Sequence, residues 1–314
     1  KVYSGIFDTL DKKNRSQIDF DKCISCGKCV SACPFGAVHK KSQLIDILKA
    51  IKNNEKLVAM VAPAIFGQLP CTPQQLKDAI LSLGFSDVIE VAEGADITTK
   101  NEAAEFKERM EEGQNFMTTS CCAGYNELVE KHIPELKPFR SETKTPAYYT
   151  AEIVKKENPN VKTVFFSPCI AKRREATQNP NIDYVLNYDE LGAWFVALNV
   201  QVANFEGSEF RKECSAQARN FAVTGGVAGA VNSLLEDDEK AKPYIVDGLN
   251  KQSIRDLKKF AKNGVCELGN LIEVMACPGG CLGGSNTTNA YKPALKQLTA
   301  YVGESPEIKD VIKE

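Results

Sequence analysis

Twelve cysteines in a chain of 314 residues constrain what this sequence can fold into more than any other feature. Disulfides do not persist in a reducing cytosol, so cysteines at this density indicate metal binding or redox chemistry. Only two histidines, His39 and His132, are available, which nearly excludes a Rieske centre or a three-histidine zinc site. We therefore predict that most of the cysteines ligate iron-sulfur clusters. Eight of them occur in tight sets, namely Cys23, Cys26, Cys29 and Cys33, the pair Cys121 and Cys122, and the pair Cys277 and Cys281.

The composition is that of an ordinary soluble globular protein and favours no macromolecular partner. Hydrophobic residues make up 43% of the chain, charged residues 25%, and the formal net charge is -2. This balance gives no electrostatic bias toward nucleic acid or membranes. No apolar run approaches the ~18 to 20 residues that span a bilayer, and the N-terminus lacks the pattern of a signal peptide. We expect a cytoplasmic protein of one large domain or two ordinary ones, which binds neither nucleic acid nor membrane.

The first cysteine set, from Cys23 to Pro34, has the C-x2-C-x2-C-x3-C-P spacing of bacterial ferredoxins. A zinc knuckle is the alternative, but zinc sites rarely use a third and fourth cysteine at these intervals. In two-cluster ferredoxins the fourth cysteine of such a run ligates the other cluster. Cys33 would then serve a second 4Fe-4S cluster, and residues 1–22 contain no cysteine to complete it. We therefore expect a matching cysteine run upstream of Lys1, and we assign 1–41 to an incomplete ferredoxin-like α+β segment.

From residue 42 onward the sequence alternates between predicted helices and buried strands. Helices are predicted at 42–52, 73–84 and 98–113, and strands at 56–62, 87–92, 114–119, 161–166 and 220–224. This alternation indicates an α/β fold for residues 42–314, with functional residues at the ends of strands. The turn at Thr224-Gly225-Gly226 lacks the full glycine fingerprint of a phosphate-binding loop. A plain strand-to-helix turn is the favoured interpretation of it.

Three sequence blocks carry the chemistry. They are TSCCAGY at 119–125, SPCIAKRRE at 167–175 and EVMACPGGCLGG at 273–284. In their order and content the blocks resemble the signature motifs of the catalytic domain of the FeFe hydrogenases, over roughly residues 45 to 295, and the ferredoxin run matches an accessory domain of that family. The resemblance implies a two-lobed α/β catalytic domain, with β-sheets flanked by helices and the cluster between the lobes.

The resemblance also implies an H-cluster, which is a 4Fe-4S cubane bridged to a two-iron subsite that carries CO, CN and an azadithiolate. It makes Cys122, Cys169, Cys277 and Cys281 the ligands of the cubane, and thiolates are the ligands that stabilise such clusters. It also pairs the Lys172 ammonium with a cyanide, and a buried ammonium needs a counter-charge of this kind. The polypeptide does not supply the two-iron ligands, so hydrogenase maturation proteins are implied as partners. The residues that we place around the cofactor are Ala62, Pro63, Ser167, Pro168, Met275, Gly279 and Gly280.

The assignment of Met275 has an alternative, and the assignment of the two glycines has a physical reason of its own. Met275 is equally well interpreted as an ordinary core methionine. Glycines at 279 and 280 remove side chains where an inorganic cofactor is expected to lie against the backbone.

A proton path is indicated by spacing as well as by resemblance. Glu102, Glu105 and Arg109 share one face of the predicted helix at 98–113. On pattern alone a solvated face is the simpler interpretation. The resemblance instead places both glutamates and Ser141 in a proton relay, and makes Cys121 the thiol that passes a proton to the bridging amine.

Several residues depart from the commonest pattern of the family. Ala123 stands where the family usually has proline, Tyr125 where it has tryptophan, and Ala147 where it has glutamine. Ser167 stands in place of methionine, and Ser285-Asn286 stands in place of Gly-Gln. We expect these residues to surround the active site and to change the polarity near the two-iron unit. Cys71, Cys214 and Cys266 have no role in the family pattern; buried structural thiols are favoured over redox-sensing ones.

Three functions follow from the sequence. The first is a hydrogenase that interconverts H2 with two protons and two electrons, with a ferredoxin or similar electron carrier as its partner. The second is a hydrogen-sensing relative of low turnover. The third is a hydrogenase-like iron-sulfur assembly protein without a two-iron subsite. Keeping Cys121, Glu102, Glu105, Ser141 and Lys172 together argues against the third function, because a protein without proton chemistry has no use for the set.

Overall fold

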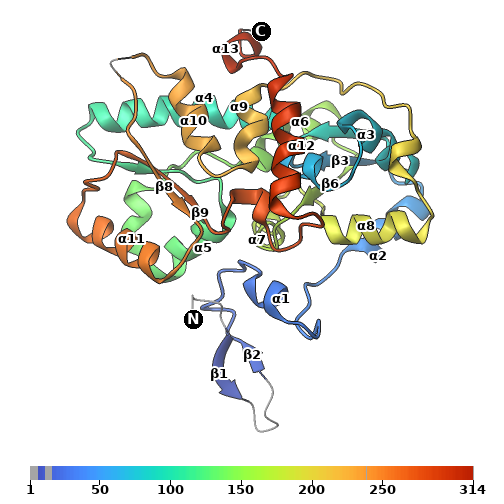
Figure 1. Ribbon diagram of the computed structural model, residues 1–314, viewed down its shortest axis with the longest axis horizontal. Coiled ribbons are helices and arrows are strands. Elements are labelled where there is room, and N and C mark those ends of the chain that lie inside the picture. Colours follow the sequence, from blue (N-terminus) through green and yellow to red (C-terminus); the bar gives the residue numbers. More distant parts are fainter. Residues whose placement is uncertain (1–5, 11–15, 238, 314) are drawn as a thin grey trace.

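The computed structural model describes residues 6–10, 16–237 and 239–313, and it confirms the predicted α/β class (Figure 1). The strands are β1 (Ile6–Leu10), β2 (Ser16–Ile18), β3 (Leu57–Val61), β4 (Asp87–Glu90), β5 (Met117–Thr118), β6 (Lys162–Ser167), β7 (Tyr184–Asn187), β8 (Pro243–Asp247) and β9 (Leu271–Met275). The helices are α1 (Lys28–Ala32), α2 (Leu44–Lys52), α3 (Pro73–Ser82), α4 (Ala92–Glu111), α5 (Ala123–His132), α6 (Pro146–Glu157), α7 (Ala171–Ala176), α8 (Tyr188–Ala197), α9 (Ala216–Arg219), α10 (Gly226–Leu234), α11 (Lys251–Asn263), α12 (Tyr291–Gly303) and α13 (Ile308–Val311). Short 3-10 helices are η1 (Pro63–Gly67), η2 (Pro134–Phe139), η3 (Val202–Asn204), η4 (Asn220–Ala222) and η5 (Gly280–Gly283). None of the described helices has both the length and the apolar character needed to cross a membrane.

The first lobe is built on a parallel sheet in the order β4-β3-β6-β7. Alternate residues of β3 point to opposite faces: Leu57 and Ala59 pack in one core with α2, α3, α8 and α12, whereas Val58 and Met60 pack in another core with α6. Strands buried on both faces read as continuous apolar runs, which is why this segment was recognisable from sequence.

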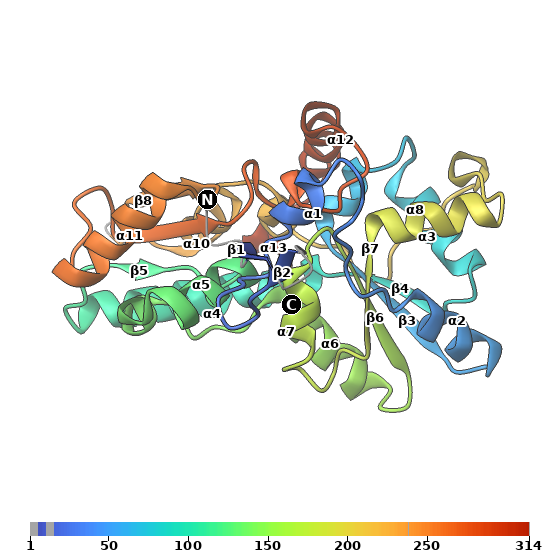
Figure 2. The ribbon, with the colours of Figure 1, turned by 90° about the horizontal axis from the view of Figure 1, so that it is seen from below.

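The second lobe is built on a smaller parallel sheet in the order β5-β9-β8. Ile272 and Val274 of β9 face α5 and α11, whereas Leu271 faces α10 and α4. Figure 2 shows the two lobes side by side, with α12 above the region between them. The carboxyl ends of the strands in both sheets therefore deliver their loops to the middle of the molecule.

Helix α4 belongs to both lobes. Its 20 residues make a rod about 30 Å long. Ala92 and Ala95, in its first turns, pack beside Phe221, and Ala103 and Phe106 pack under the second sheet. The helix begins at Ala92 and not at residue 98 as predicted, because tertiary packing against α6 overrides the low helix propensity of the glycine in its first turn.

Most of the other predicted elements are confirmed. The helices predicted at 42–52 and 73–84 are α2 and α3, and the strands predicted at 56–62, 87–92, 114–119 and 161–166 are β3, β4, β5 and β6. The strand predicted at 220–224 is wrong, because Asn220–Ala222 form the 3-10 helix η4, which continues α9. The Ser215 hydroxyl caps α9 by accepting from Ala218 N at 2.9 Å, and this local start signal decides the conformation that follows. A short apolar run does not by itself distinguish a strand from a buried helical turn.

The N-terminal segment lies on one side of the two lobes (Figure 1). Strands β1 and β2 pair in antiparallel fashion, and the cysteine run follows them as a loop that leads into α1. Ile24 and Cys26 are buried in the core of the second lobe, beside Tyr125 and Ala276. The segment is therefore anchored next to the loops that carry the later cysteines.

Candidate functional site

Strands of both lobes end in cysteines. Cys122 follows β5, Cys277 follows β9 two residues after its last residue, and Cys169 follows β6 of the other lobe. Cys281 lies in η5, one turn beyond Cys277. This matches the expectation that ligands of an α/β fold emerge from the carboxyl ends of parallel strands.

The four cysteines are partly buried and lie close to one another. Burial raises the pKa of Cys169 to about 11 and that of Cys281 to about 12, and the neighbouring Cys122 contributes to both shifts. The pKa of Cys277 is also raised, by burial and then by Cys169 and Cys122. Such thiols ionise only when positive charge is placed between them, and the iron of a cubane supplies that charge. The donor set therefore fits a 4Fe-4S cubane.

A single metal ion is a different case. Among the described residues, no three His, Cys, Asp or Glu side chains are arranged to hold one metal ion. A cubane requires its thiolates to be spread around a cluster and not to converge on one point.

A cavity of about 90 Å³ opens beside these cysteines and is almost entirely apolar. Four of the residues predicted to surround a cofactor line it, namely Ala62, Pro63, Ser167 and Pro168. It is also lined by Cys121, Cys122, Cys169, Cys281 and Lys172. Met275 lies in the same apolar cluster as Cys121 and Cys122. The cavity thus brings the three sequence blocks together in space.

The residues that depart from the family pattern divide into two groups. Ala123, Ala147 and Ser167 line the cavity, as expected. Tyr125 is instead buried in the core of the second lobe, where its hydroxyl donates to Thr118 Oγ1 at 2.7 Å. Ser285 and Asn286 are not among the lining residues of the cavity.

Gly279 and Gly280 have left-handed backbone conformations, with φ of 76° and 74°. A Cβ at Gly279 would lie 2.8 Å from Tyr291 Cδ2, and one at Gly280 would lie 2.7 Å from Thr224 N. The protein's own chain therefore occupies the space beside these glycines. The predicted contact of a cofactor with the backbone of these glycines stays a prediction.

Lys172 has a protein partner inside this site. Its Nζ lies 2.7 and 2.9 Å from the two carboxylate oxygens of Glu175 and donates to the Cys121 carbonyl at 3.2 Å. Burial lowers the pKa of Lys172, but the Glu175 carboxylate outweighs burial and the net pKa lies above its ordinary value. Thr145 Oγ1 donates to Glu175 at 2.7 Å and holds the carboxylate in place. Glu175 was not predicted, although it lies one helical turn after Lys172 in α7.

Glu102 is an unusual carboxyl group. It is fully buried on α4, its Oε1 accepts from Ser120 N at 3.1 Å, and its Oε2 has no partner among the described residues. Burial raises the pKa of Glu102 to about 8, although the Ser120 N–H partly opposes the shift. Burial also raises the pKa of Cys121 well above its ordinary value, and the nearby Glu102 adds to that effect. Both groups therefore carry a proton at neutral pH.

A chain of polar side chains leads from Glu102 toward solvent through Ser141, Glu105 and Arg109. The Ser141 hydroxyl donates to Glu105 Oε2 at 2.6 Å. Arg109 pairs with Glu105 Oε1 at 2.7 Å. Burial raises the pKa of Glu105, but donation from Ser141 and from Glu142 N outweighs it, so the net pKa is lowered. Glu105 and Arg109 line an open polar cavity of about 570 Å³.

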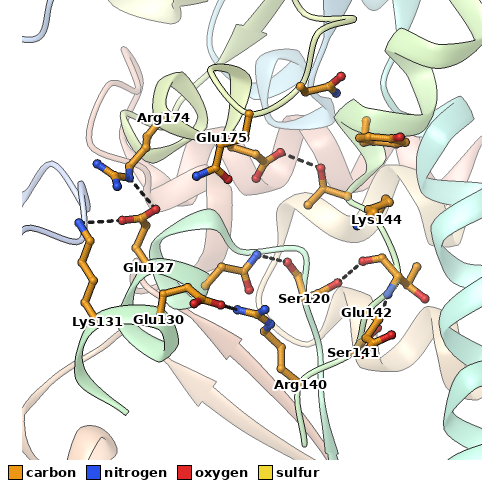
Figure 3. A pocket seen from close by; sticks show the side chains of 16 residues that line it. Ser120, Glu127, Glu130, Lys131, Arg140, Ser141, Glu142, Lys144, Arg174 and Glu175 are labelled. Carbon is orange, nitrogen blue, oxygen red and sulfur yellow. Dashed lines mark hydrogen bonds and ion pairs between the residues drawn. The ribbon is translucent and has the colours of Figure 1, made fainter. Parts of the chain in front are cut away.

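A larger polar cavity, of about 880 Å³, lies between α5, α6 and α7 (Figure 3). Ser120, Ser141 and Glu175 all line it, so it borders both Glu102 and the Lys172 pair. Its remaining charges are mostly paired: Glu127 bonds Arg174 at 2.7 Å and Lys131 at 2.8 Å. Water in this cavity has access to the polar side of the site.

The turn at Thr224-Gly225-Gly226 is occupied by a carboxylate of the chain itself. Glu273, fully buried on β9, accepts from Gly225 N at 2.7 Å and from Ala228 N at 2.8 Å. The N-terminus of α10, where an anion would otherwise bind, is thereby satisfied. This agrees with a plain turn, and it identifies Glu273 as a structural residue that sequence analysis did not assign.

The N-terminal cysteines are not equivalent. Burial raises the pKa of Cys26 and Cys29, and the neighbouring thiol of Cys23 adds to both shifts. In contrast, the pKa of Cys33 is lowered by backbone N–H groups, and Ala37 N donates to its Sγ at 3.3 Å. The structure therefore brings three of the four thiols together and sets Cys33 apart.

The cysteines and histidines without a predicted role are not among the lining residues of the cavity, although Cys214 packs in the same apolar cluster as Met275, Cys121 and Cys122. Cys214 and Cys266 are buried and Cys71 is partly buried. His132 contacts the Lys22 carbonyl through Nε2 at 2.8 Å, and His39 is exposed.

Known proteins resemble this chain in sequence and in fold. Residues 55–285 match the family described as iron only hydrogenase large subunit, C-terminal domain, and residues 16–39 match a 4Fe-4S binding domain. The chain is 27% identical to the NADP-reducing hydrogenase subunit HndD of Solidesulfovibrio fructosivorans, over 83% of this chain and only 55% of that relative. It is 26% identical to the cytosolic Fe-S cluster assembly factor NAR1 of Meyerozyma guilliermondii, over 56% of this chain and 39% of NAR1. A solved variant of the FeFe-hydrogenase HydA1 from Chlamydomonas reinhardtii has a TM-score of 0.67 at 18% identity and covers 86% of this chain and 92% of its own.

Proposed function

This chain belongs to the iron-only hydrogenase large-subunit family, and we propose that it is an enzyme that interconverts H2 with two protons and two electrons. The observation that carries the proposal is the buried, partly unpartnered carboxyl of Glu102, close to the cavity thiol of Cys121 on one side and Ser141 on the other. A carboxyl whose pKa is raised to about 8 and that faces no cation suits proton transfer better than structural support.

The cofactor that we infer is the H-cluster. When held by Cys122, Cys169, Cys277 and Cys281, it would supply the two-iron chemistry that makes or cleaves H2. The apolar cavity beside these residues excludes bulk water from that chemistry. Lys172, fixed by Glu175, presents an ammonium to the same cavity and would balance an anionic ligand there.

We infer that protons move along the protein in four steps. The Cys121 thiol exchanges a proton at the cavity, and the Glu102 carboxyl receives or returns it. The Ser141 hydroxyl then connects Glu102 to Glu105, with its 2.6 Å bond to Glu105 already formed. Arg109 holds Glu105 at the edge of the outer polar cavity, where water completes the path.

Electrons would enter through the N-terminal segment. We assign residues 1–41 to this accessory segment and 42–314 to the catalytic domain. Cys23, Cys26 and Cys29 would share one 4Fe-4S cluster, and Cys33 would ligate a second one. The implied partners are a ferredoxin-type carrier and hydrogenase maturation proteins, and the implied location is the cytoplasm.

An iron-sulfur assembly factor is the second candidate, because NAR1 is 26% identical over 56% of this chain. A low-turnover hydrogen sensor differs from the enzyme only in rate. Infrared spectra of the anaerobically matured protein separate these functions, since bound CO and CN give bands in a hydrogenase or sensor and none in an assembly factor. Hydrogen evolution with reduced ferredoxin then separates enzyme from sensor.

The variant that tests the proposed function is Cys121→Ala. We expect it to keep the infrared bands and to lose hydrogen evolution by a factor of about 10² to 10⁴, the usual contribution of a positioned acid-base group. Cys71→Ala, a partly buried cysteine outside the cavity, is the matched control and should keep full activity. Undiminished hydrogen evolution by Cys121→Ala would contradict the proposed role of Cys121 in proton transfer.

A further inference from the structure

Two neighbouring residues, Ser285 and Asn286, contact three separate parts of the molecule. We propose that this dipeptide, here called the Ser285-Asn286 joint, positions the N-terminal iron-sulfur segment against the loops that carry Cys169 and Cys281, and so controls electron transfer between the two clusters. The inference rests only on cluster binding by the two cysteine sets. It therefore holds for a hydrogenase and for an assembly factor alike.

The first contact of the joint is with the cysteine run. Ser31 Oγ donates to the Ser285 carbonyl at 3.2 Å. Gly27, which lies between Cys26 and Lys28 and has φ of 75°, approaches the Ser285 side chain so closely that a Cβ there would lie 2.6 Å from Ser285 Cβ. A side chain at position 27 would therefore push the cysteine run away from the joint.

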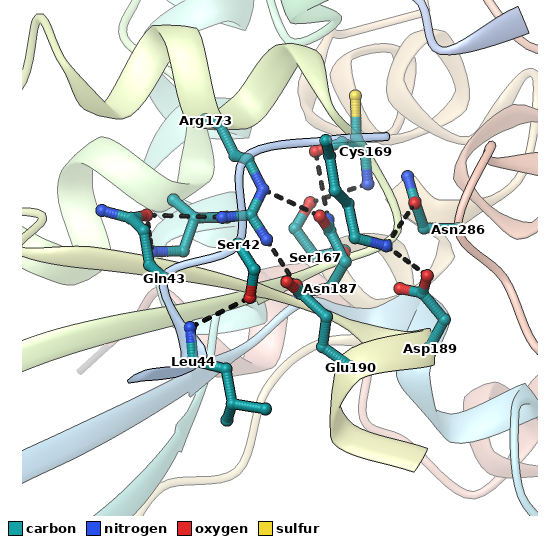
Figure 4. A network of polar contacts seen from close by, with 12 residues as sticks. Ser42, Gln43, Leu44, Ser167, Cys169, Arg173, Asn187, Asp189, Glu190 and Asn286 are labelled. Carbon is teal, nitrogen blue, oxygen red and sulfur yellow. Dashed lines mark hydrogen bonds and ion pairs between the residues drawn. The ribbon is translucent and has the colours of Figure 1, made fainter. Parts of the chain in front are cut away.

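The second contact is with the segment that connects α1 to α2 (Figure 4). Lys40 Nζ donates to Asn286 Oδ1 at 2.8 Å and also forms an ion pair with Asp189 at the start of α8. The Lys40 side chain is only 10% exposed, so this contact is shielded from solvent. Lys40 thus ties the connecting segment to both the joint and the first lobe.

The third contact is with the loop that carries Cys169. Asn286 N donates to the Pro168 carbonyl at 3.1 Å, and Asn286 is itself buried. Asn187 Nδ2 fixes the same loop from the other side by donating to the Ser167 carbonyl at 2.7 Å, as Figure 4 shows. The joint therefore has a rigid support where it meets the cubane ligands.

These contacts fix the distance between two redox centres. Cys26 is buried in the same group of side chains as Cys122 and Ala276, so the two cysteine sets are near neighbours. With clusters bound at both cysteine sets and dithionite as the external reductant, one electron would pass from the group held by Cys23, Cys26 and Cys29 to the group held by Cys122, Cys169, Cys277 and Cys281. Electron tunnelling slows steeply with distance, so a small displacement of the N-terminal segment has a large effect on the rate.

The test compares Lys40→Met with Lys41→Met in the full chain with both clusters loaded. Lys41 is the exposed neighbour of Lys40 and serves as the matched control. Iron and sulfide content, the magnetic coupling of the two reduced clusters by electron paramagnetic resonance, and the rate of intercluster electron transfer are measured. We expect Lys40→Met to keep its iron, to lose magnetic coupling and to transfer electrons at least tenfold more slowly, whereas Lys41→Met behaves as the parent protein.

A second set of variants keeps the proposal testable if Lys40→Met fails to fold. Gly27→Ala should weaken coupling or cluster loading, and adding Ser285→Gly should restore it by removing the side chain that the new Cβ meets. Gly36→Ala is its control, because that glycine also has positive φ, 59°, but a Cβ there meets nothing closer than His39 at 3.7 Å. Unchanged coupling in fully loaded Lys40→Met, or no recovery in the double variant, would overturn the proposal. Because neither measurement involves H2, its failure is distinct from failure of the proposed function.

Discussion

Two groups of buried carboxylates lie along β4 and α4, and they are treated differently by the fold. In the first group, Glu90 is bound by Arg219 at 2.7 Å and by the Tyr301 hydroxyl at 2.9 Å, and Glu93 is bound by Arg211 at 3.0 Å. Asp96 accepts from the Ser215 hydroxyl and backbone N–H. In the second group, farther along the same helix, Glu102 faces no cation and keeps one oxygen without a described partner.

The difference bears on our proposal that Glu102 carries protons whereas the first group supports the fold. Glu90 and Glu93 are held by arginines and Asp96 by hydrogen bonds, so the positions of all three are fixed. A buried carboxyl without a cation keeps its proton until the surroundings change, which is the property required of a relay. Both groups are buried to a similar degree, so the partners make the distinction and not the depth.

The largest effect is expected for Glu102→Gln. The amide keeps the shape of the side chain but cannot exchange a proton, so hydrogen evolution should fall by about 10² or more. Glu93→Gln removes a carboxylate of the first group from the same helix and should leave turnover within about twofold. Equal losses in the two variants would show that the two groups do not differ in function.

Arg219→Met should have the largest effect on stability. It leaves Glu90 buried without a counter-charge, which typically costs about 3 to 5 kcal/mol. Urea unfolding of the cluster-free protein under anaerobic conditions measures the loss. The double variant Arg219→Met, Glu90→Gln should recover a large part of it, and a double variant no more stable than the single one would contradict the pairing argument.

Glu102 contributes to the pH dependence of stability, as Glu90 and Asp96 do, because burial raises the pKa of all three. The Glu102 pKa of about 8 in the folded protein exceeds the ordinary value of 4.5, so between these limits the folded state holds a proton that the unfolded state has released. Stability from this group is therefore full below pH 4.5 and declines by about 1.4 kcal/mol per pH unit as the pH rises to 8. Subtracting the stability curve of Glu102→Gln from that of the parent protein should isolate this slope. A flat difference would mean that Glu102 is ionised when folded.

The smallest effect is expected for Ser141→Ala, which removes the hydroxyl between Glu102 and Glu105. Turnover should fall by about tenfold, because water from the adjoining cavity can replace part of the connection. Ser215→Ala removes a comparable hydroxyl from Asp96 in the first group. It should cost about 1 kcal/mol of stability and leave turnover unchanged. A loss of turnover in Ser215→Ala alone would reverse the assignment of the two groups.

Local patterns in the sequence predicted much of the fold. The strand before Cys169 was recognisable because a strand buried on both faces is a continuous apolar run, and the cysteine positions followed from motifs at strand ends. The strand predicted at 220–224 was wrong because its apolar residues pack in a helical turn that a cap several residues earlier had set up. The pattern of residues 220–224 alone does not indicate a helical turn.

The site was predicted less completely than the fold. The resemblance supplied Cys121, Glu102 and Ser141, and the structure places them in one region. It could not supply the Ser285-Asn286 joint, because the partners of these residues lie more than a hundred positions away in the chain. Glu175 had a weak signal in its spacing from Lys172, but an acidic residue after a lysine on a helix is common on any surface.

Strand β5 has only two residues; it pairs with β9, which lies far along the chain at Leu271 and Ile272, and Thr118 also forms an isolated bridge to Arg140. During synthesis, the cysteine pair that follows β5 leaves the ribosome long before β9 exists to hold it. Contacts between such distant segments form late, after the local helices. The thiols at Cys121 and Cys122 therefore reach their final places only after β9 has been made.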